Sequence, residues 1–364
     1  MDPDLLLADL LAGKTSALAR AISVVENGRA GFERLLAGAH RHLGRAHRVG
    51  ITGPPGAGKS TLVERLVAAY RSAGLRVGVV AVDPTSPFTG GALLGDRIRM
   101  ESIALDEGVY IRSMATRGSL GGLATTTREV CDLLDAAGFD RIVVETVGVG
   151  QSELDVTRMA DTTVLVLVPE SGDGIQTLKS GVMEAVDCFV VNKSDRPGAD
   201  KLRQEIEVTL GIRRGNAFRN VPAHHGMRGS RAPARRGDKR TAGHDEHAPA
   251  SRESRGTGTA DGAWEHPVLL TVAAKGEGTA ELVEALDRHR AWLERSGGLV
   301  ERRRRRMLER TREVVDRATR RWVWGETRAE ETIAAHLDDV VAGRLSPYEL
   351  AADVLDGLKQ GERI

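Results

Sequence analysis

The sequence predicts an α/β fold in which a mainly parallel sheet is flanked by helices, with helical arms at both ends of the chain. Three observations support this prediction. Short, continuously apolar strands alternate with helical segments, a glycine-rich loop follows the first strand, and leucines recur at helical spacing near the N-terminus. Because strands buried on both faces are apolar throughout, the alternation indicates a parallel sheet that helices cover on both sides.

The chain divides into three predicted regions. Residues 1–45 form an N-terminal helical arm, where leucines follow the helical period. Residues 46–296 form the α/β domain, and residues 297–364 form a C-terminal helical arm that begins with a Gly-Gly pair. Within the domain, residues 213–262 nearly lack large aliphatic side chains. We expect this stretch to be a disordered insertion, because it cannot bury enough apolar area to offset its ordering entropy.

The individual elements follow in order along the chain. The predicted strands are residues 49–52, 77–82, 141–145, 163–168, 189–191 and 267–271. The predicted helices of the α/β domain are residues 61–73, 201–210 and 279–295. Residues 299–324 form a basic helix, and we interpret its arginine run, Arg302 to Arg306, as a solvated face or a dimer contact. A capping box begins the last helix, where Ser346 precedes Pro347 and Glu349.

Composition excludes several classes of function. The chain has 364 residues, with 52 Lys and Arg against 51 Asp and Glu, so its formal net charge of +1 argues against a nucleic-acid binder. No apolar run approaches the roughly 20 residues of a membrane span, and the N-terminus lacks a basic signal-peptide start. We therefore expect a cytoplasmic protein without membrane contacts. Cys131 and Cys188 lie far apart and are expected to be buried thiols in a reducing compartment.

The glycine-rich loop carries the strongest motif. Residues 53–60 fit the pattern G-x-x-x-x-G-K-S, and they lie between a strand and a helix as a phosphate-binding loop requires. Lys59 is placed to reach the β and γ phosphates of a nucleotide, and the Ser60 hydroxyl to bind Mg²⁺. This motif predicts the P-loop NTPase fold. The residues expected to contact nucleotide phosphates are Gly53, Gly56, Ala57, Gly58, Lys59, Ser60 and Thr61.

A second motif identifies the base. Asn192, Lys193 and Asp195 fit the pattern N-K-x-D directly after a strand. The Asp195 carboxylate can accept hydrogen bonds from N1–H and the 2-amino group of guanine, whereas adenine would leave that carboxylate unpaired. Asn192 and Lys193 would brace the loop and cover the ring. The motif therefore favours GTP and GDP over adenine nucleotides.

A third loop contains Ala273, Ala274 and Lys275. In many GTPases a Ser-Ala-Lys loop at this place gives a backbone N–H to the guanine oxygen. The backbone contact survives the change from serine to alanine, although a hydroxyl is lost. The alternative is an ordinary connection between a strand and a helix.

Candidates for sensing the γ phosphate follow the strand at residues 141–145. Glu145 and Gly148 form an E-x-x-G pattern, in which Glu145 would act on Mg²⁺ directly or through water and the Gly148 N–H would contact the γ phosphate. Gln151 could orient the attacking water, or it is a solvated loop residue. Asp83 ends another apolar strand, where open α/β sheets bind ligands.

Four oxygen-bearing side chains are thus the magnesium candidates: Ser60, Asp83, Asp96 and Glu145. For Asp83 and Asp96 the alternative role is a helix cap. A glycine-rich acidic loop, residues 170–176, either moves with the nucleotide or is a surface turn.

The motifs together closely resemble the methylmalonyl-CoA mutase-associated GTPase family, which are G-protein chaperones of an adenosylcobalamin-dependent mutase. The shared stretches are G-P-P-G-A-G-K-S-T, D-P-T-S-P, G-D-R-I-R-M, E-T-V-G-V-G-Q-S-E, G-D-G-I-Q and N-K-S-D. The resemblance covers residues 48–212, resumes near Trp264 and includes both helical arms. The insertion at residues 213–262 departs from the family pattern.

The resemblance implies several properties. It implies a homodimer joined through the C-terminal helices, slow GTP hydrolysis that the mutase stimulates, and a GTP state that gates cofactor loading and the release of damaged cofactor. Adenosylcobalamin would belong to the partner enzyme. The counterparts of Asp83, Asp96 and Glu145 gather near magnesium in the family, and the loop matching residues 170–176 rearranges.

Two other functions are weighed against this one. The first is a GTPase that delivers a metal such as nickel, because the insertion contains His224, His225, His244 and His247. No cysteine pair flanks the phosphate loop, which weakens that alternative. The second is a small-molecule kinase, for which the sequence shows no dedicated acceptor pocket.

Overall fold

A single sheet of seven parallel strands organises the molecule, which confirms the predicted parallel sheet flanked by helices. The computed structural model describes residues 2–83, 100–115, 122–146, 152–170, 182–213 and 262–359. The strands lie in the order β3-β2-β4-β1-β5-β6-β7, and every neighbouring pair is parallel. They are β1 (His47–Thr52), β2 (Val77–Asp83), β3 (Val109–Ala115), β4 (Arg141–Thr146), β5 (Thr162–Leu167), β6 (Cys188–Asn192) and β7 (Val268–Thr271).

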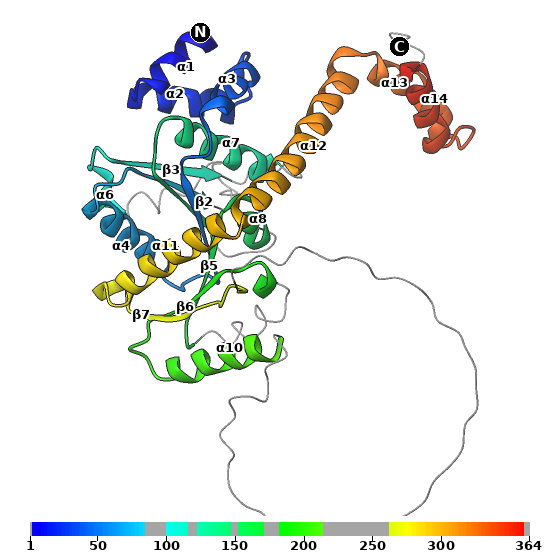
Figure 1. The fold of residues 1–364 in the computed structure, drawn as a ribbon. Coiled ribbons are helices and arrows are strands. Elements are labelled where there is room, and N and C mark those ends of the chain that lie inside the picture. The colour runs from blue at the N-terminus through cyan, green and yellow to red at the C-terminus, as the bar shows by residue number, and fades with distance from the viewer. Residues whose placement is uncertain are drawn as a thin grey trace, which may run out of the picture.

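Helices cover both faces of the sheet (Figure 1). On one face lie α4 (Lys59–Ser72) and α11 (Thr279–Arg295), with the short α6 (Glu101–Ala104) beside α4. On the other face lie α7 (Gly122–Ala136) and α8 (Ser152–Met159), while α10 (Ala199–Arg213) covers β6 and β7. Alternate residues of β4 point to opposite faces of the sheet: Ile142 and Val144 pack toward α7, and Val143 packs toward α4.

All six predicted strands are present, and the seventh strand, β3, was not predicted from the sequence. This strand forms an edge of the sheet and pairs only with β2. Tyr110, Arg112 and Ser113 are only partly buried there, so the strand lacks the continuous apolar run that marks the central strands.

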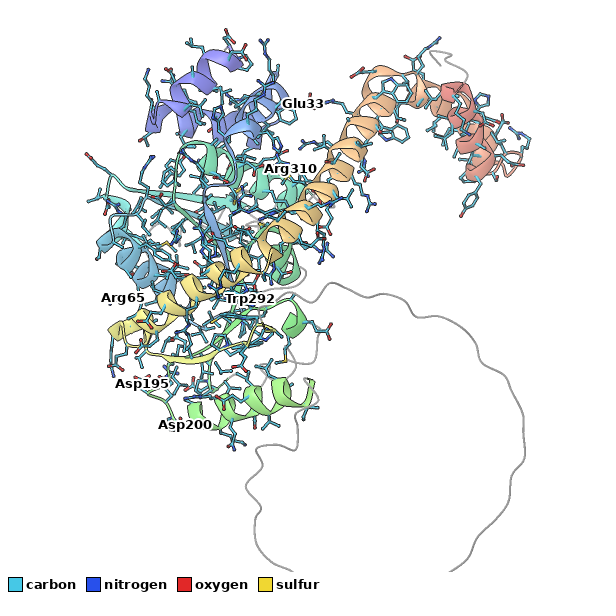
Figure 2. All side chains as sticks on the ribbon, in the orientation of Figure 1. Glu33, Arg65, Asp195, Asp200, Trp292 and Arg310 are labelled. Atoms are coloured by element: carbon cyan, nitrogen blue, oxygen red, sulfur yellow. The ribbon has the colours of Figure 1, made fainter. Side chains whose placement is uncertain are left out.

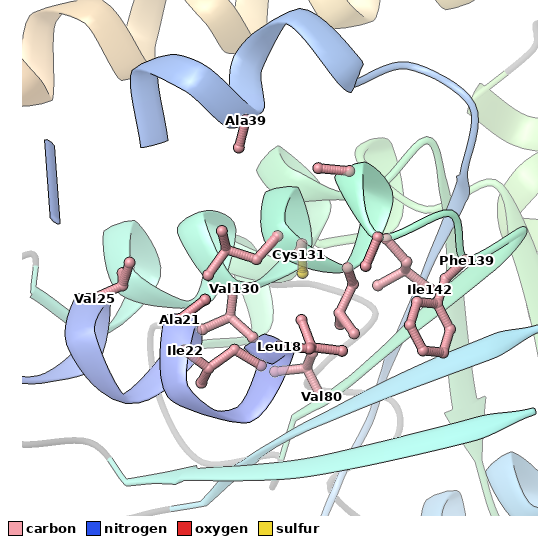
Figure 3. Packing of buried hydrophobic residues seen from close by; sticks show 14 of the residues in the cluster. Leu18, Ala21, Ile22, Val25, Ala39, Val80, Val130, Cys131, Phe139 and Ile142 are labelled. Atoms are coloured by element: carbon pink, nitrogen blue, oxygen red, sulfur yellow. The ribbon is translucent and has the colours of Figure 1, made fainter. Parts of the chain in front are cut away.

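The N-terminal residues form α1 (Pro3–Leu11), α2 (Thr15–Glu26) and α3 (Phe32–Ala39), followed by the short helix η1 (His40–His42). Helices α2 and α3 pack against α7, α1 packs on α2 and α3, and all of them share one hydrophobic cluster with the sheet. In Figure 3, Leu18 and Ile22 of α2 lie beside Val130 and Cys131 of α7. The N-terminal helices and this face of the sheet therefore share a continuous core.

Both cysteines are buried free thiols, as predicted. Cys131 lies in the cluster between α2 and α7, and burial raises the pKa of its thiol to about 11. Within the described part of the chain, no helix is long and apolar enough to cross a bilayer.

The C-terminal arm consists of three helices, α12 (Gly298–Glu326), α13 (Ala329–Val341) and α14 (Pro347–Lys359). Helix α12 leaves α11 at Gly297 and carries α13 and α14 away from the sheet (Figure 1). The last two helices pack on one another around Ala329, Leu350 and Val354. The capping box of α14 is confirmed, because the Glu349 N–H donates to Ser346 Oγ (3.1 Å) and the Ser346 N–H donates to Glu349 Oε2 (2.8 Å).

The arginine run at the start of α12 corrects a prediction. Arg302 donates to Asp187 through two bonds of 2.7 and 2.9 Å, and Arg303 and Arg306 bind Asp161. The expectation of a solvated face or dimer contact was therefore wrong for these three residues. Asp161 and Asp187 directly precede β5 and β6, so the arginines lie at the amino-terminal edge of the sheet.

Farther along α12, the same face carries two more arginines that pair with carboxylates of α7. Arg310 pairs with Asp132 of α7, and Arg317 donates to Glu129 of α7 (2.8 Å). We call Arg302, Arg303, Arg306, Arg310 and Arg317 the arginine ladder. Figure 2 shows Arg310 where α12 crosses the body of the molecule.

The arginine ladder supplies positive charge to carboxylates that are buried. Burial raises the pKa of Asp187, but hydrogen bonds from His289 and Arg302 outweigh it and lower the pKa to about 2. For Asp161, the positive charges of Arg306 and Arg303 likewise hold the pKa of the carboxyl below its usual range despite burial. Both carboxylates are therefore ionised in the folded protein, and each depends on the arginines of α12.

We expect the replacement Arg306→Ala to lower the free energy of unfolding by about 1.5–3 kcal/mol, because the buried Asp161 carboxylate would lose one of its two guanidinium partners from α12 and keep only Arg303. Arg305→Ala is the matched control, because Arg305 stands next in the same run and is exposed. That control should change the free energy by no more than about 0.5 kcal/mol. Urea titrations followed by circular dichroism measure both. Equal effects of the two replacements would contradict a specific role for Arg306.

Candidate nucleotide-binding site

The loops that carry the sequence motifs meet at the carboxyl-terminal edge of the sheet. The glycine-rich loop follows β1, the N-K-x-D residues begin at the last residue of β6, and the Ala-Ala-Lys turn follows β7. Open parallel sheets bind their ligands at this edge.

The glycine-rich loop, residues 53–58, depends on two glycines for steric reasons. Gly53 has φ +141°, and a Cβ there would lie 2.0 Å from the carbonyl oxygen of Val166 on β5. Gly58 has φ +84°, and a Cβ there would lie 2.5 Å from Asn192 Nδ2. Any side chain at these positions would push the loop away from the two neighbouring strands.

Lys59 begins α4 and folds back over the loop. Its ammonium group donates to the carbonyl oxygens of Gly53 (2.9 Å) and Pro54 (3.0 Å), and the residue is 6% exposed. The amide groups of Lys59, Ser60 and Thr61 belong to the first turn of α4, where backbone N–H groups have no partner inside the helix. A positive charge and the N–H groups of a helix N-terminus at one place make an anion site suited to phosphate.

Ser60 and Glu145 bring two oxygen donors together beside this loop. The Ser60 hydroxyl donates to Glu145 Oε1 (2.7 Å), and Glu145 is buried at the end of β4. Mg²⁺ prefers oxygen ligands, so a hydroxyl and a carboxylate at this spacing fit that ion. Asp83 ends β2, the strand that pairs with β4, so its backbone lies at the same edge.

Several predicted residues lie outside the described part of the structure. They are Asp96, Gly148, Gln151, residues 171–176 of the acidic loop and the four histidines of the insertion. The side chain of Asp83 also lies outside it. Their roles stay predictions.

Asn192 connects the phosphate loop to the loop after β7. Its Nδ2 donates to the carbonyl oxygen of Ala57 (2.8 Å), and its Oδ1 accepts from the Ala273 N–H (3.0 Å) and the Thr271 hydroxyl (3.1 Å). The residue is 2% exposed. The position needs a donor and an acceptor on one short side chain, which asparagine has and aspartate lacks.

The next residues of the motif stand at the surface. Lys193 has φ +56° and donates from Nζ to the Gly56 carbonyl oxygen (2.8 Å). The Asp195 side chain is 45% exposed, and its carboxylate lies 3.6 Å from Lys275 Nζ. The carboxylate therefore remains open to a ligand that lies along the loop.

Sequence reasoning missed Arg65, an exposed residue of α4. Its guanidinium group donates to the carbonyl oxygens of Ala273 (3.1 Å) and Ala274 (2.9 Å). An arginine on a helix surface predicts no specific partner, and this one lies 208 residues away in the chain. No sequence pattern could have found it.

Comparisons with known proteins agree with this geometry. The family model described as "Methylmalonyl Co-A mutase-associated GTPase MeaB" matches residues 18–328. A protein of Pyrococcus horikoshii that is named as a GTPase is 42% identical over 353 residues, 97% of each chain. A Mycobacterium tuberculosis protein, also named as a GTPase, is 37% identical and covers 94% of this chain and 91% of its own. The crystal structure of an LAO/AO transport system kinase is 26% identical, with a TM-score of 0.62, and covers 98% of this chain and 97% of that one.

We expect Asn192→Ala to weaken GDP binding by about 10- to 100-fold, because the Ala273 N–H and the Thr271 hydroxyl would lose their buried acceptor. Titration calorimetry measures the affinity. Asn27→Ala, in the N-terminal helices, is the control and should leave the affinity unchanged. An unchanged affinity in Asn192→Ala would show that the two loops do not need this link.

Proposed function

Because the chain belongs to the family of the methylmalonyl Co-A mutase-associated GTPase MeaB, we propose that it serves an adenosylcobalamin-dependent methylmalonyl-CoA mutase as a chaperone. The chain is a GTP-binding enzyme that hydrolyses GTP, the activity for which its relatives are named. Its GTP state would gate cofactor loading and the release of damaged cofactor from the mutase. The cofactor itself belongs to that partner.

Two comparisons support the choice of client. The family description names the mutase. A mouse protein named "Methylmalonic aciduria type A homolog, mitochondrial" is 42% identical over 206 residues, which cover 53% of this chain and 50% of that protein. For this chain we propose a cytoplasmic location, on the composition of the sequence.

Hydrolysis would proceed by positioning and charge stabilisation. Lys59 and the amides of the first turn of α4 hold the phosphates and stabilise negative charge on the transferring phosphoryl group. Ser60 and Glu145, with Asp83 and Asp96 as further candidates, would hold Mg²⁺, which neutralises charge on the phosphate oxygens.

Residues in the loops after β4 and β6 would supply the remaining catalytic roles and would select the base. The Gly148 N–H would contact the γ phosphate, and Gln151 would orient the attacking water. Asp195 would select guanine through its N1–H and 2-amino groups, beside Asn192 and Lys193. The observation that best supports a guanine nucleotide site here is the link that Asn192 makes between the phosphate loop and the turn at Ala273.

We also propose a homodimer formed through the C-terminal arm. Leu308, Val315 and Trp322 stand seven residues apart on α12, opposite the arginine ladder, and are 53%, 56% and 44% exposed. Such a heptad stripe of apolar residues is suited to pairing with another helix. Of the fifteen large apolar side chains that are exposed among the described residues, ten lie in residues 300–355. A second copy of the arm would cover this surface.

We expect slow GTP hydrolysis by the purified protein and faster hydrolysis when a methylmalonyl-CoA mutase is added. Lys59→Ala should reduce both rates by about 100-fold or more, because it removes a charge at the phosphate site. Phosphate release measures the rates, and Lys201→Ala, 81% exposed at its side chain, is the control. Turnover that the mutase leaves unchanged, without a detectable complex, would refute the proposed client while leaving a GTPase.

The dimer has its own test. The double replacement Val315→Asp and Trp322→Asp should give a monomer, because it places two charges in the apolar stripe. Light scattering after size exclusion measures the mass. Leu105→Asp, a control at a residue 93% exposed on the body of the molecule, should leave a dimer. A monomeric parent protein would refute the dimer outright.

A further inference from the structure

The Arg65 side chain holds the turn after β7 by two carbonyl groups. Arg65 lies six residues after Lys59 on α4, and Nε and Nη2 each donate to one of two consecutive carbonyl oxygens, those of Ala273 and Ala274. The planar guanidinium group matches such a pair, because its N–H groups project in a fixed fork. In Figure 2, Arg65 and Asp195 lie toward the same side of the molecule.

The turn itself, η3 (Ala273–Lys275), leaves one backbone donor for a ligand. The Ala273 N–H donates to Asn192, and the Lys275 N–H donates to the Val272 carbonyl oxygen (2.9 Å). Within the described ranges, the Ala274 N–H has no hydrogen-bond acceptor, and Ala274 is exposed. An exposed, free N–H between two bonded neighbours is available to an outside acceptor.

The carbonyl group that Arg65 binds and this free donor are parts of one rigid unit. The Ala273 C=O and the Ala274 N–H belong to the same planar trans peptide, so they point in opposite directions. A guanidinium group on the oxygen therefore fixes the direction of the N–H. It also polarises the peptide and makes the N–H a stronger donor.

We propose that Arg65 is a positioning residue for base recognition, which directs the Ala274 N–H at the 6-keto oxygen of guanine. The proposal rests on the guanine site proposed above. Arg65 acts from the helix whose first turn faces the phosphates, so the same helix orients groups at both ends of the nucleotide. Asn192 holds the amide side of the turn, and Arg65 holds its carbonyl side.

The test asks whether the effect of Arg65 follows the 6-keto oxygen. Three diphosphates are compared: GDP, IDP, which keeps that oxygen but lacks the 2-amino group, and 2-aminopurine riboside diphosphate, which lacks the oxygen. Arg65→Ala should weaken GDP and IDP by about tenfold each and should change the 2-aminopurine nucleotide by less than about twofold. Arg65→Lys should restore only part of the loss, because a single ammonium group cannot span both carbonyl oxygens in the fork geometry.

The matched control is Arg71→Ala. Arg71 also lies on α4, but it binds Asp106 and the Leu75 carbonyl oxygen, so its loss should leave all three affinities unchanged. Equal weakening of all three nucleotides by Arg65→Ala, or no weakening at all, would overturn the proposal.

Asp195→Asn separates this proposal from the guanine site on which it rests. That replacement should shift preference from GDP to xanthosine diphosphate, because the amide can donate to the 2-keto oxygen of xanthine. Absence of the shift would overturn the guanine site and the role of Arg65 with it. The shift, together with equal effects of Arg65→Ala on the three nucleotides, would overturn the role of Arg65 alone.

Discussion

The parallel direction of all seven strands decides where each part of the molecule lies. Because the strands share one direction, every strand end falls at one of two edges. The carboxyl-terminal edge gathers the loops after β1, β6 and β7, and hence the residues that we propose to bind the phosphates and the base. The amino-terminal edge gathers Asp161 and Asp187, which are buried and need cations. The nucleotide site and the anchor of the C-terminal arm are therefore separated by the length of the strands.

Helix α8 connects these two edges. It begins at Ser152, shortly after the strand that carries Glu145, and it ends at Met159, whose carbonyl oxygen accepts from Arg306. One helix thus has its start near the phosphate site and its end on α12. Helix α7 also touches the arm, through Glu129 and Asp132. The arm is therefore attached to helices α7 and α8 as well as to the residues that precede β5 and β6.

The sequence predicted those parts of the molecule whose cause is local. Continuous apolar strands and the G-K-S motif each depend on neighbouring residues, so β1 and the phosphate loop were predicted correctly. The partners of Arg302 and Arg306 depend instead on where a long helix lies. The sequence of an arginine run is the same whether the run faces water or buried carboxylates. The interpretation of that run failed for this reason, since Asp187 and Asp161 precede it by 115 and 145 residues. Strand β3 was not predicted because a strand at the edge of a sheet tolerates polar side chains such as Arg112, so its sequence lacks a continuous apolar run.

The turn after β7 shows how tertiary contacts can replace a local one. Many GTPases have a serine at the position of Ala273, and its hydroxyl is lost here. The turn is nevertheless held from three sides, by Asn192 on its amide, by Arg65 on its carbonyl oxygens, and by the bond between the Val272 N–H and the Glu277 carbonyl oxygen (3.1 Å). None of these contacts needs a side-chain oxygen at residue 273. An alanine is sufficient there because the backbone alone carries the geometry, and the cost is a stricter dependence on residues that lie far away in the chain.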